Sequence, residues 1–195
     1  MALTIVTAPA VEPLTAAECK SHSRIDTSAD DTLLGTYIKA ARIYAEETLL
    51  GRQLITATWD WILDKFPSGL EPLYPPRPPL QSVTSITYTD EDGDEQTWSS
   101  AEYTVDTDSE PGRIVPAYDE VYPTTRNVIN AVTVRFKAGH GDAATDVPEP
   151  SRQLIRFIVA LWHEYREPIV DGRAVHNVSR TIDSLRWSQC VWRPV

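Results

Sequence analysis

Residues 47–63 read ETLLGRQLITATWDWIL, and the periodicity of the chain changes within them. Before Gly51, apolar residues recur at steps of three and four, as on one face of an amphipathic helix. From Gln53 onward they alternate with polar residues, as in a strand with one buried face. Gly51 stands where a left-handed C-cap would end the helix. The stretch therefore predicts a helix over residues 30–50 that is followed directly by a β region.

Upstream of this point the chain is predicted to be helical. Thr15 and Glu18 have the capping-box spacing, in which a hydroxyl and a carboxylate each satisfy a backbone donor of the first helical turn. A short helix should follow, to about Arg24. We therefore assign residues 1–52 to an N-terminal helical part.

Downstream, residues 53–147 are predicted to form a small, mostly antiparallel β subdomain. A proline-rich connection, residues 67–79, precedes a β-branched and aromatic run at residues 83–88. Asp92-Gly93 offers a tight hairpin turn. Further strands are expected at residues 96–98, 103–105 and 132–136.

A second helical region, residues 148–195, begins near Pro150, because proline is tolerated in the first helical turn. Every residue from Phe157 to Trp162 is apolar, which predicts a helix enclosed on most sides or a subunit contact. Pro168 should end it, with a loop at residues 170–177 and a short last helix at residues 181–187. The predicted fold is α+β, one composite domain in which a bundle of N- and C-terminal helices carries an inserted β subdomain.

The charge of the chain is unevenly distributed. The formal net charge is −10, and residues 53–147 hold 16 acidic against 6 basic residues. Sequence-independent binding to nucleic acid phosphates needs an excess of Lys and Arg, so this balance argues against it. Residues 148–195 are slightly basic through arginine alone, among them Arg152 and Arg156. The two regions are predicted to face different partners.

Several functional classes have no support in the sequence. We find no signal peptide and no membrane span, which indicates a soluble protein of the host cytoplasm or of a particle. Cys19 and Cys190 lie far apart without metal-ligand spacing, so no zinc site is expected, and no cofactor is expected either. Nucleophile elbows, phosphate loops and dinucleotide fingerprints are missing, and the chain is therefore predicted not to be an enzyme.

Two acidic features leave a hydrolase as a distant alternative. Residues 90–95 superficially resemble a calcium loop, but neither Gly93 nor Ala101 fits the EF-hand positions, so a solvated hairpin tip is favoured. Asp60 and Asp64, beside two tryptophans, could serve as paired carboxylates of a glycosidase. An alternating strand explains them more simply.

The order of several segments resembles the head-tail connector family of long-tailed bacteriophages. These segments are Pro-Leu-Thr-Ala-Ala-Glu (13–18), Arg-Ile-Asp (24–26), Asp-Asp-Thr-Leu-Leu (30–34), Glu-Thr-Leu-Leu-Gly-Arg-Gln-Leu-Ile-Thr (47–56), Arg-Pro-Pro-Leu-Gln-Ser-Val (77–83), Val-Pro-Glu-Pro-Ser-Arg-Gln (147–153) and Glu-Tyr-Arg-Glu (164–167). The resemblance covers residues 11–170. The C-terminal segment, Ser184 to Val195, departs from the family pattern.

The resemblance implies a virion protein at the head-tail interface, about twelve copies of which form a ring under the portal. The ring would extend the DNA channel, pass DNA without binding it specifically, and dock the next head-completion or tail protein. A stopper or tail-completion protein is the alternative. We expect portal docking by Arg180, Arg186, Trp187, Trp192 and Arg193. We expect subunit packing through Leu34, Ile38, Phe157, Leu161 and Trp162, and an acidic channel or rim at Asp90, Glu91, Asp92, Asp94 and Glu95.

Overall fold

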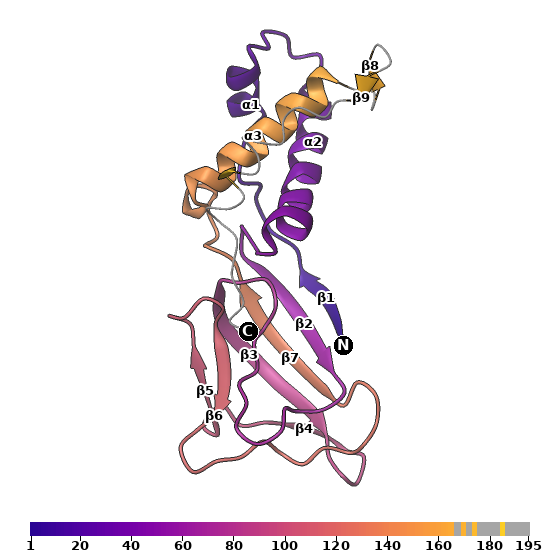
Figure 1. Ribbon diagram of the computed structural model, residues 1–195, viewed down its shortest axis with the longest axis vertical. Helices are drawn as coiled ribbons and strands as arrows, with labels where there is room; N and C mark the ends of the chain where they lie inside the picture. Colours follow the sequence, from indigo (N-terminus) through magenta and orange to yellow (C-terminus); the bar gives the residue numbers. More distant parts are fainter. Residues whose placement is uncertain (166–168, 171–172, 175–183, 186–195) are drawn as a thin grey trace. The chain divides into compact units, whose positions relative to one another are not determined.

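The computed structural model describes residues 1–165, 169–170, 173–174 and 184–185, and it has a mixed α+β fold (Figure 1). The described chain divides into two compact units. The β unit contains residues 1–9 and 56–140. The helical unit contains residues 10–55 and the described residues from 141 onward. Within the described residues the chain therefore passes between the units three times.

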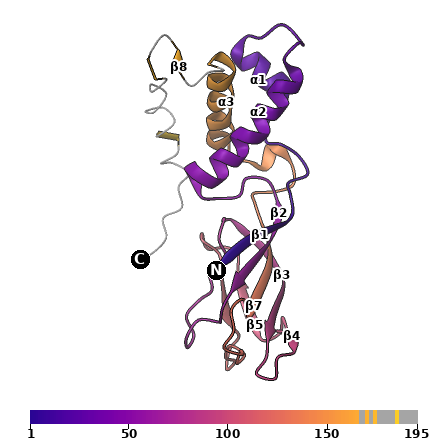
Figure 2. The same ribbon diagram turned by 90° about the vertical axis from the view of Figure 1, so that its right-hand side faces the viewer.

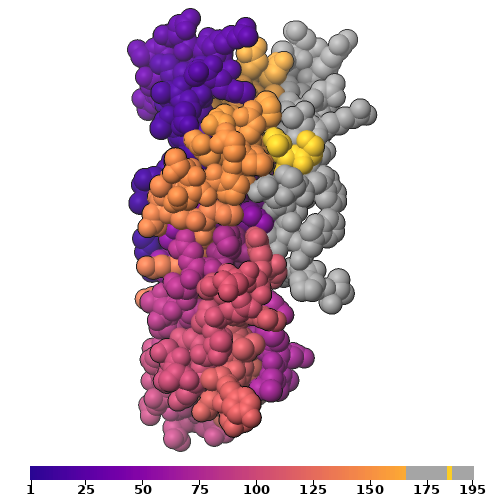
Figure 3. All heavy atoms as spheres, turned by 90° about the vertical axis from the view of Figure 1, so that its left-hand side faces the viewer, coloured from indigo at the N-terminus to yellow at the C-terminus, as the bar shows by residue number. Residues whose placement is uncertain are grey.

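Three α-helices build the helical unit: α1 (Ala16–Ser23), α2 (Asp31–Tyr44) and α3 (Glu149–Glu164). A π-helical turn, η1 (Ala45–Leu50), continues α2, and a 3-10 turn, η2 (Ala144–Asp146), precedes α3. Figures 2 and 3 show α3 packed against α1 and α2. Their apolar faces form one core, with Leu34, Ile38, Leu54, Leu154 and Ile155 among its fully buried members.

The predicted bounds of the first two helical segments, which end near Arg24 and at Gly51, are confirmed, and capping explains α1 and the end of η1. The Thr15 hydroxyl accepts a hydrogen bond from the Glu18 backbone N–H at 3.2 Å, and the Glu18 carboxylate accepts one from the Thr15 N–H at 2.8 Å. Arg24 ends α1 in a left-handed conformation. Gly51 ends η1 with a φ of 66°, in the left-handed region that glycine adopts without a steric penalty. The predicted helical bundle is not confirmed as such. In the described residues the helical unit consists of three α-helices, the π-helical turn η1 and the 3-10 turn η2.

The β unit is organised around a five-stranded antiparallel sheet in the order β1-β2-β7-β3-β4. A two-stranded sheet, β5-β6, accompanies it. Trp59 and Trp61 of β2 lie opposite Phe136 and Val134 of β7, so the predicted alternation places these side chains in one core. The strands are β1 (Ala2–Thr7), β2 (Ala57–Leu63), β3 (Leu80–Thr89), β4 (Glu95–Thr97), β5 (Tyr103–Asp106), β6 (Arg113–Pro116) and β7 (Val132–Ala138).

The structure differs from the sequence prediction at both ends of the chain. Residues 1–52 were assigned to the helical part, yet β1 pairs with β2 at the edge of the sheet. At the other end, short strands β8 (Ile169–Val170) and β9 (Arg173–Ala174) pair where a loop was predicted. Ser184 and Leu185 are helical, and the rest of the predicted last helix lies outside the described residues.

Within one copy α3 is not enclosed along its whole apolar run, and the predicted alternative, a subunit contact on this helix, stays a prediction. Ile158 and Val159 are buried, but Phe157, Leu161 and Trp162 are only partly buried. The reason is that α3 packs against α1 and α2, which do not surround it. When every residue of a helical segment is apolar, the sequence does not indicate which face of the helix is buried.

A buried polar network lies inside the helical unit, where α2 passes into η1. Arg42 and Glu46 are 5 % and 3 % exposed and form an ion pair of 2.7 Å. Arg42 Nε also donates to Glu12 at 2.7 Å. The other oxygen of Glu46 accepts from Gln53 Nε2 at 2.8 Å and from the Leu54 N–H at 3.0 Å. One helical turn thus holds the two segments that connect the helical unit to β1 and β2.

Replacing Arg42 by Met should destabilise the protein by about 3–5 kcal/mol, because the substitution leaves the Glu46 carboxylate buried without its cation. Urea denaturation followed by circular dichroism measures the free energy of unfolding. Lys39→Met, one turn earlier on the exposed side of α2, is the matched control and should change this energy by no more than about 0.5 kcal/mol. Equal effects of the two substitutions would contradict the assigned role of Arg42.

Candidate functional site

The acidic segment predicted to line a channel or its rim forms the turn between β3 and β4. Asp90 folds inward: its carboxylate accepts hydrogen bonds from the Gly93 and Asp94 N–H groups, at 3.0 and 2.9 Å, and from Gln96 Nε2 at 2.8 Å. The bond from Gln96 and those from the backbone lower the pKa of Asp90. The side chains of Glu91, Asp92, Asp94 and Glu95 are exposed. Four carboxylates of the segment therefore face solvent, and the fifth shapes the turn.

The acids considered for glycosidase chemistry are held by structural contacts. Asp60 on β2 forms a bidentate pair with Arg135 on β7, at 2.7 and 2.8 Å. Asp64 accepts the Asn130 N–H at 2.9 Å. Both carboxylates thus have partners within the sheet unit that hold them in place. This arrangement favours the structural interpretation of both residues.

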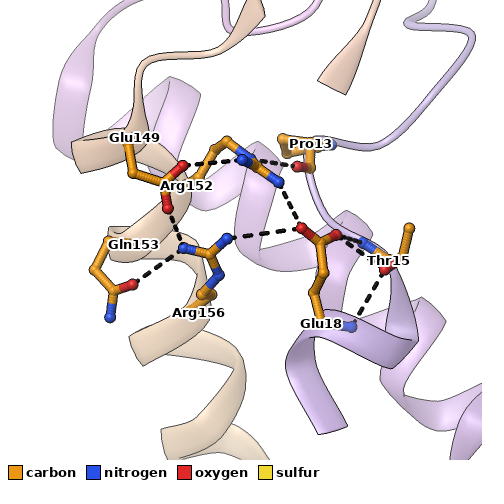
Figure 4. Close-up of polar contacts among 7 residues, drawn as sticks. All are labelled: Pro13, Thr15, Glu18, Glu149, Arg152, Gln153 and Arg156. Atoms are coloured by element: carbon orange, nitrogen blue, oxygen red, sulfur yellow. Dashed lines mark hydrogen bonds and ion pairs between the residues drawn. The ribbon is translucent and has the colours of Figure 1, made fainter. Parts of the chain in front are cut away.

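A polar cluster joins α1 to α3, and Figure 4 shows its members. Arg152 of α3 contacts Glu18 Oε1 at 2.5 Å and donates to the Pro13 carbonyl at 3.1 Å. Arg156 lies 3.7 Å from the same Glu18 oxygen and pairs with Glu149. The two arginines were candidates for a partner-facing basic surface. The structure instead places both guanidinium groups in contacts within the helical unit.

The same cluster shifts two carboxyl pKa values downward. Hydrogen bonds from the Thr15 backbone N–H and hydroxyl, with the nearby charges of Arg152 and Arg156, lower the pKa of Glu18 despite its partial burial. The hydrogen bond from Arg156, followed by the charges of both arginines, lowers the pKa of Glu149. Both acids are therefore held in the charged form.

The residues predicted for subunit packing divide into two groups. Leu34 and Ile38 are 0 % and 2 % exposed within their own unit, so their side chains have no surface to offer a neighbouring copy. Phe157, Leu161 and Trp162 are partly exposed on α3. Subunit packing through these three remains a prediction.

The residues predicted for portal docking lie outside the described residues. They are Arg180, Arg186, Trp187, Trp192 and Arg193. Leu185, just before four of them, packs against the helical core. Docking therefore stays a prediction, and Leu185 marks the last described attachment of this segment.

Sequence reasoning missed an apolar groove of about 960 Å³ in the β unit. Two loops form it, residues 65–70 and 115–125, and a stacked pair of rings, Phe66 and Tyr122, lies at its base with centroids 5.2 Å apart. Large apolar side chains stand exposed around it: Leu70 at 66 %, Tyr118 at 93 % and Val121 at 71 %. The groove could have been suspected from the apolar residues Tyr118 and Val121, which stand in an otherwise polar loop after β6.

Searches for other kinds of site give no candidate within the described part of the chain. No group of three or more His, Cys, Asp or Glu side chains there could hold a metal ion. None of the helices described is long and apolar enough to span a membrane.

Comparison with known proteins identifies relatives by sequence and by fold. Residues 14–110 match the family model of the phage gp6-like head-tail connector proteins, which confirms the resemblance seen in the sequence. No curated protein matches the chain.

The fold is also found in solved structures of gene transfer agent (GTA) particles. They are the neck of an empty particle with C6 symmetry (TM-score 0.80, 24% identity), the virion of the native particle (0.79, 24%) and the neck of the native particle with C12 symmetry (0.78, 23%). Each match covers 100% of this chain and 98% of the other. The chain shares its complete fold with these proteins.

The α1–α3 cluster predicts a pH dependence of stability. The pKa values of Glu18 and Glu149 are lower in the folded state than their ordinary value of 4.5, so the stabilisation is complete above pH 4.5 and is lost as the pH falls through the folded values. Glu18→Gln keeps the capping-box geometry but removes the charge beside Arg152 and Arg156, and should cost about 0.5–1 kcal/mol at pH 7.

Urea titrations at pH 7, 4 and 3 measure this effect. The difference between wild type and Glu18→Gln should shrink as the pH falls, because protonation of Glu18 then removes the same charge. Glu164→Gln, an exposed change at the end of α3, is the control and should give a smaller difference at pH 7. A Glu18→Gln difference that stays constant with pH would refute the role of the charge.

Proposed function

This chain belongs to the family of phage gp6-like head-tail connector proteins, and we propose from this premise that it forms a ring beneath the portal of a DNA-filled head. The ring extends the DNA channel and provides the platform on which the next head-completion or tail protein docks. The protein acts by assembly and catalyses no reaction.

The observation that carries this proposal is the agreement of two independent comparisons. The family model covers the sequence of α1, α2 and strands β2 to β5. The fold of the whole chain is that of proteins found in particle necks with C6 and C12 symmetry. A neck of such symmetry surrounds a central axis, and ring copies arranged around it leave a channel. We propose about twelve copies.

The charge of the β unit supports a channel that passes DNA without holding it. Residues 90–95 of the β3–β4 turn include five acids and no basic residue, and four of these acids are exposed. Each copy therefore adds negative charge to the proposed channel or its rim. DNA binding requires the release of counterions by Lys and Arg. A ring with the opposite charge repels the duplex and offers no site where it would stop.

The C-terminal segment is the proposed contact with the portal. Arginine and tryptophan are enriched among the residues that dominate interface energies. The proposed contact residues all follow α3 in the chain: Arg180, Arg186, Trp187, Trp192 and Arg193. Side-by-side packing of copies then falls to the long helices, including the partly exposed Phe157, Leu161 and Trp162.

The second candidate function is a head-closure (stopper) or tail-completion protein one layer further from the head. Family members of either kind would share the acidic channel. They differ in position, because only a connector contacts the portal directly. Cryo-EM of assembled particles separates the two by the layer that the chain occupies.

Removal of residues 178–195 should leave a folded protein that no longer attaches to portal-containing heads. Attachment is measured by sedimentation of heads with added protein, and rings are counted by native mass spectrometry with purified portal. Removal of residues 186–195 alone, which keeps the packing of Leu185, is the matched variant. It should fold like wild type and also fail to attach. Normal attachment by both truncations would refute portal docking by this segment.

Reversal of charge at the turn tests the channel. Glu91→Lys with Asp92→Lys should make assembled rings bind duplex DNA and slow DNA release from filled particles, with an effect that weakens as salt rises. Glu102→Lys with Asp108→Lys makes the same change in charge at other exposed positions of the β unit and is the control. Equal DNA binding by the two double variants would remove the turn from the channel.

A further inference from the structure

The β unit exposes an apolar loop as well as an apolar groove. The loop is residues 127–129, Asn-Val-Ile, between β6 and β7, and we call it the knob. Ile129 is 81 % exposed and Val128 is 42 % exposed. Isolated apolar side chains are common on protein surfaces, but an exposed apolar loop together with an exposed apolar groove marks an interaction surface.

The knob is fixed in place at both ends. On its N-terminal side the Arg126 N–H donates to the Thr89 carbonyl at 3.0 Å. On its C-terminal side the Asn130 N–H donates to the Asp64 carboxylate at 2.9 Å, and Asn130 has a left-handed φ of 58°. A loop held in this way loses little conformational entropy when it binds.

The groove and the knob are neighbours in the chain, because the groove lining ends at Thr125 and the knob begins at residue 127. Residues 127–129 are not among those that line the groove, and Ile129 is too exposed to be covered by its own copy. The groove is much larger than one isoleucine side chain, so a whole loop could enter it. The two surfaces can therefore meet only between different copies.

Charge complementarity identifies the occupant of the groove. Asp119 and Glu120 are exposed on the groove lining, and with the exposed Lys65 they leave it with a net negative charge. The knob contains no acid and is preceded by the exposed cation Arg126, whose guanidinium also donates to the Asp92 carbonyl at 3.3 Å. Opposite charges beside an apolar contact set its register and discriminate against wrong partners. The knob of a second copy of this chain meets all these conditions.

We infer that the knob of one copy inserts into the groove of the next copy and joins neighbours around the ring. In the proposed ring each copy offers its knob to one neighbour and its groove to the other, and head-to-tail contacts of this kind close into rings when the rotation per copy divides a full turn. The inference rests on the proposed ring function and adds a contact in the β unit to the proposed packing of the long helices. Within the ring, many low-affinity contacts of this kind act together.

Disulfide cross-linking of rings on portal-containing heads tests the inference. In a Cys190→Ser background, the double variant Ile129→Cys with Tyr118→Cys should give a ladder of covalent multimers on oxidation. Either cysteine alone should give none, because a head-to-tail contact brings unlike positions together. Ile129→Cys with Val11→Cys, a second exposed apolar position on the helical unit, is the control and should remain monomeric.

The outcomes separate this inference from the proposed function. Normal attachment of the cysteine variants to heads, without a ladder for the 129–118 pair or for a 129–70 pair, would overturn the knob contact and leave the connector function intact. Failure of wild-type protein to form rings on heads would overturn the function and the inference together.

A second variant covers the case in which cross-linking disturbs assembly. Ile129→Asp should fold normally by circular dichroism but form rings at least tenfold less readily on purified portal. Val11→Asp should assemble like wild type. Ring formation by Ile129→Asp at the wild-type level would contradict the inference.

Discussion

The paired burial of Arg42 and Glu46 is the constraint on which the arrangement of the helical unit depends. Burial lowers the pKa of the Arg42 guanidinium, but hydrogen bonds and charges from Glu12 and Glu46 outweigh this effect and raise it. A buried ion pair is favourable only where every remaining donor and acceptor is satisfied. Here Gln53 and the Leu54 backbone supply those partners. The π-helical turn fixes one carboxylate at the point where the chain leaves the helices, so the connection to the sheet has a defined course.

The parts of the fold that were predicted from sequence follow from local rules. The Thr15–Glu18 capping box, the left-handed Gly51 and the tight turn at Gly93 each need only a few neighbouring residues. The alternation of β2 was readable because its two faces differ, one buried and one half-buried. The mixed α+β architecture was predicted from the change in periodicity between the helix that ends at Gly51 and strand β2.

The parts that were missed depend on residues distant in sequence. β1 is exposed along most of its length, so it shows no apolar alternation, and its partner strand begins 50 positions later. Arg152 and Arg156 were indistinguishable from surface arginines because their partner, Glu18, is more than 130 positions away. The candidate surfaces divide similarly: residue types indicated the acidic turn, but a groove built from two loops exists only after the β unit has folded.

The three passages of the chain between its units also determine the order in which they can form during synthesis. At about 5–20 residues per second, β1 would leave the ribosome roughly 3–10 s before β2 exists to pair with it. Its six residues carry no charge, and edge strands of this kind are prone to pairing with other chains. The helical core is completed later still, because α3 is needed to cover the apolar faces of α1 and α2. Both units therefore reach completion late and close together in time.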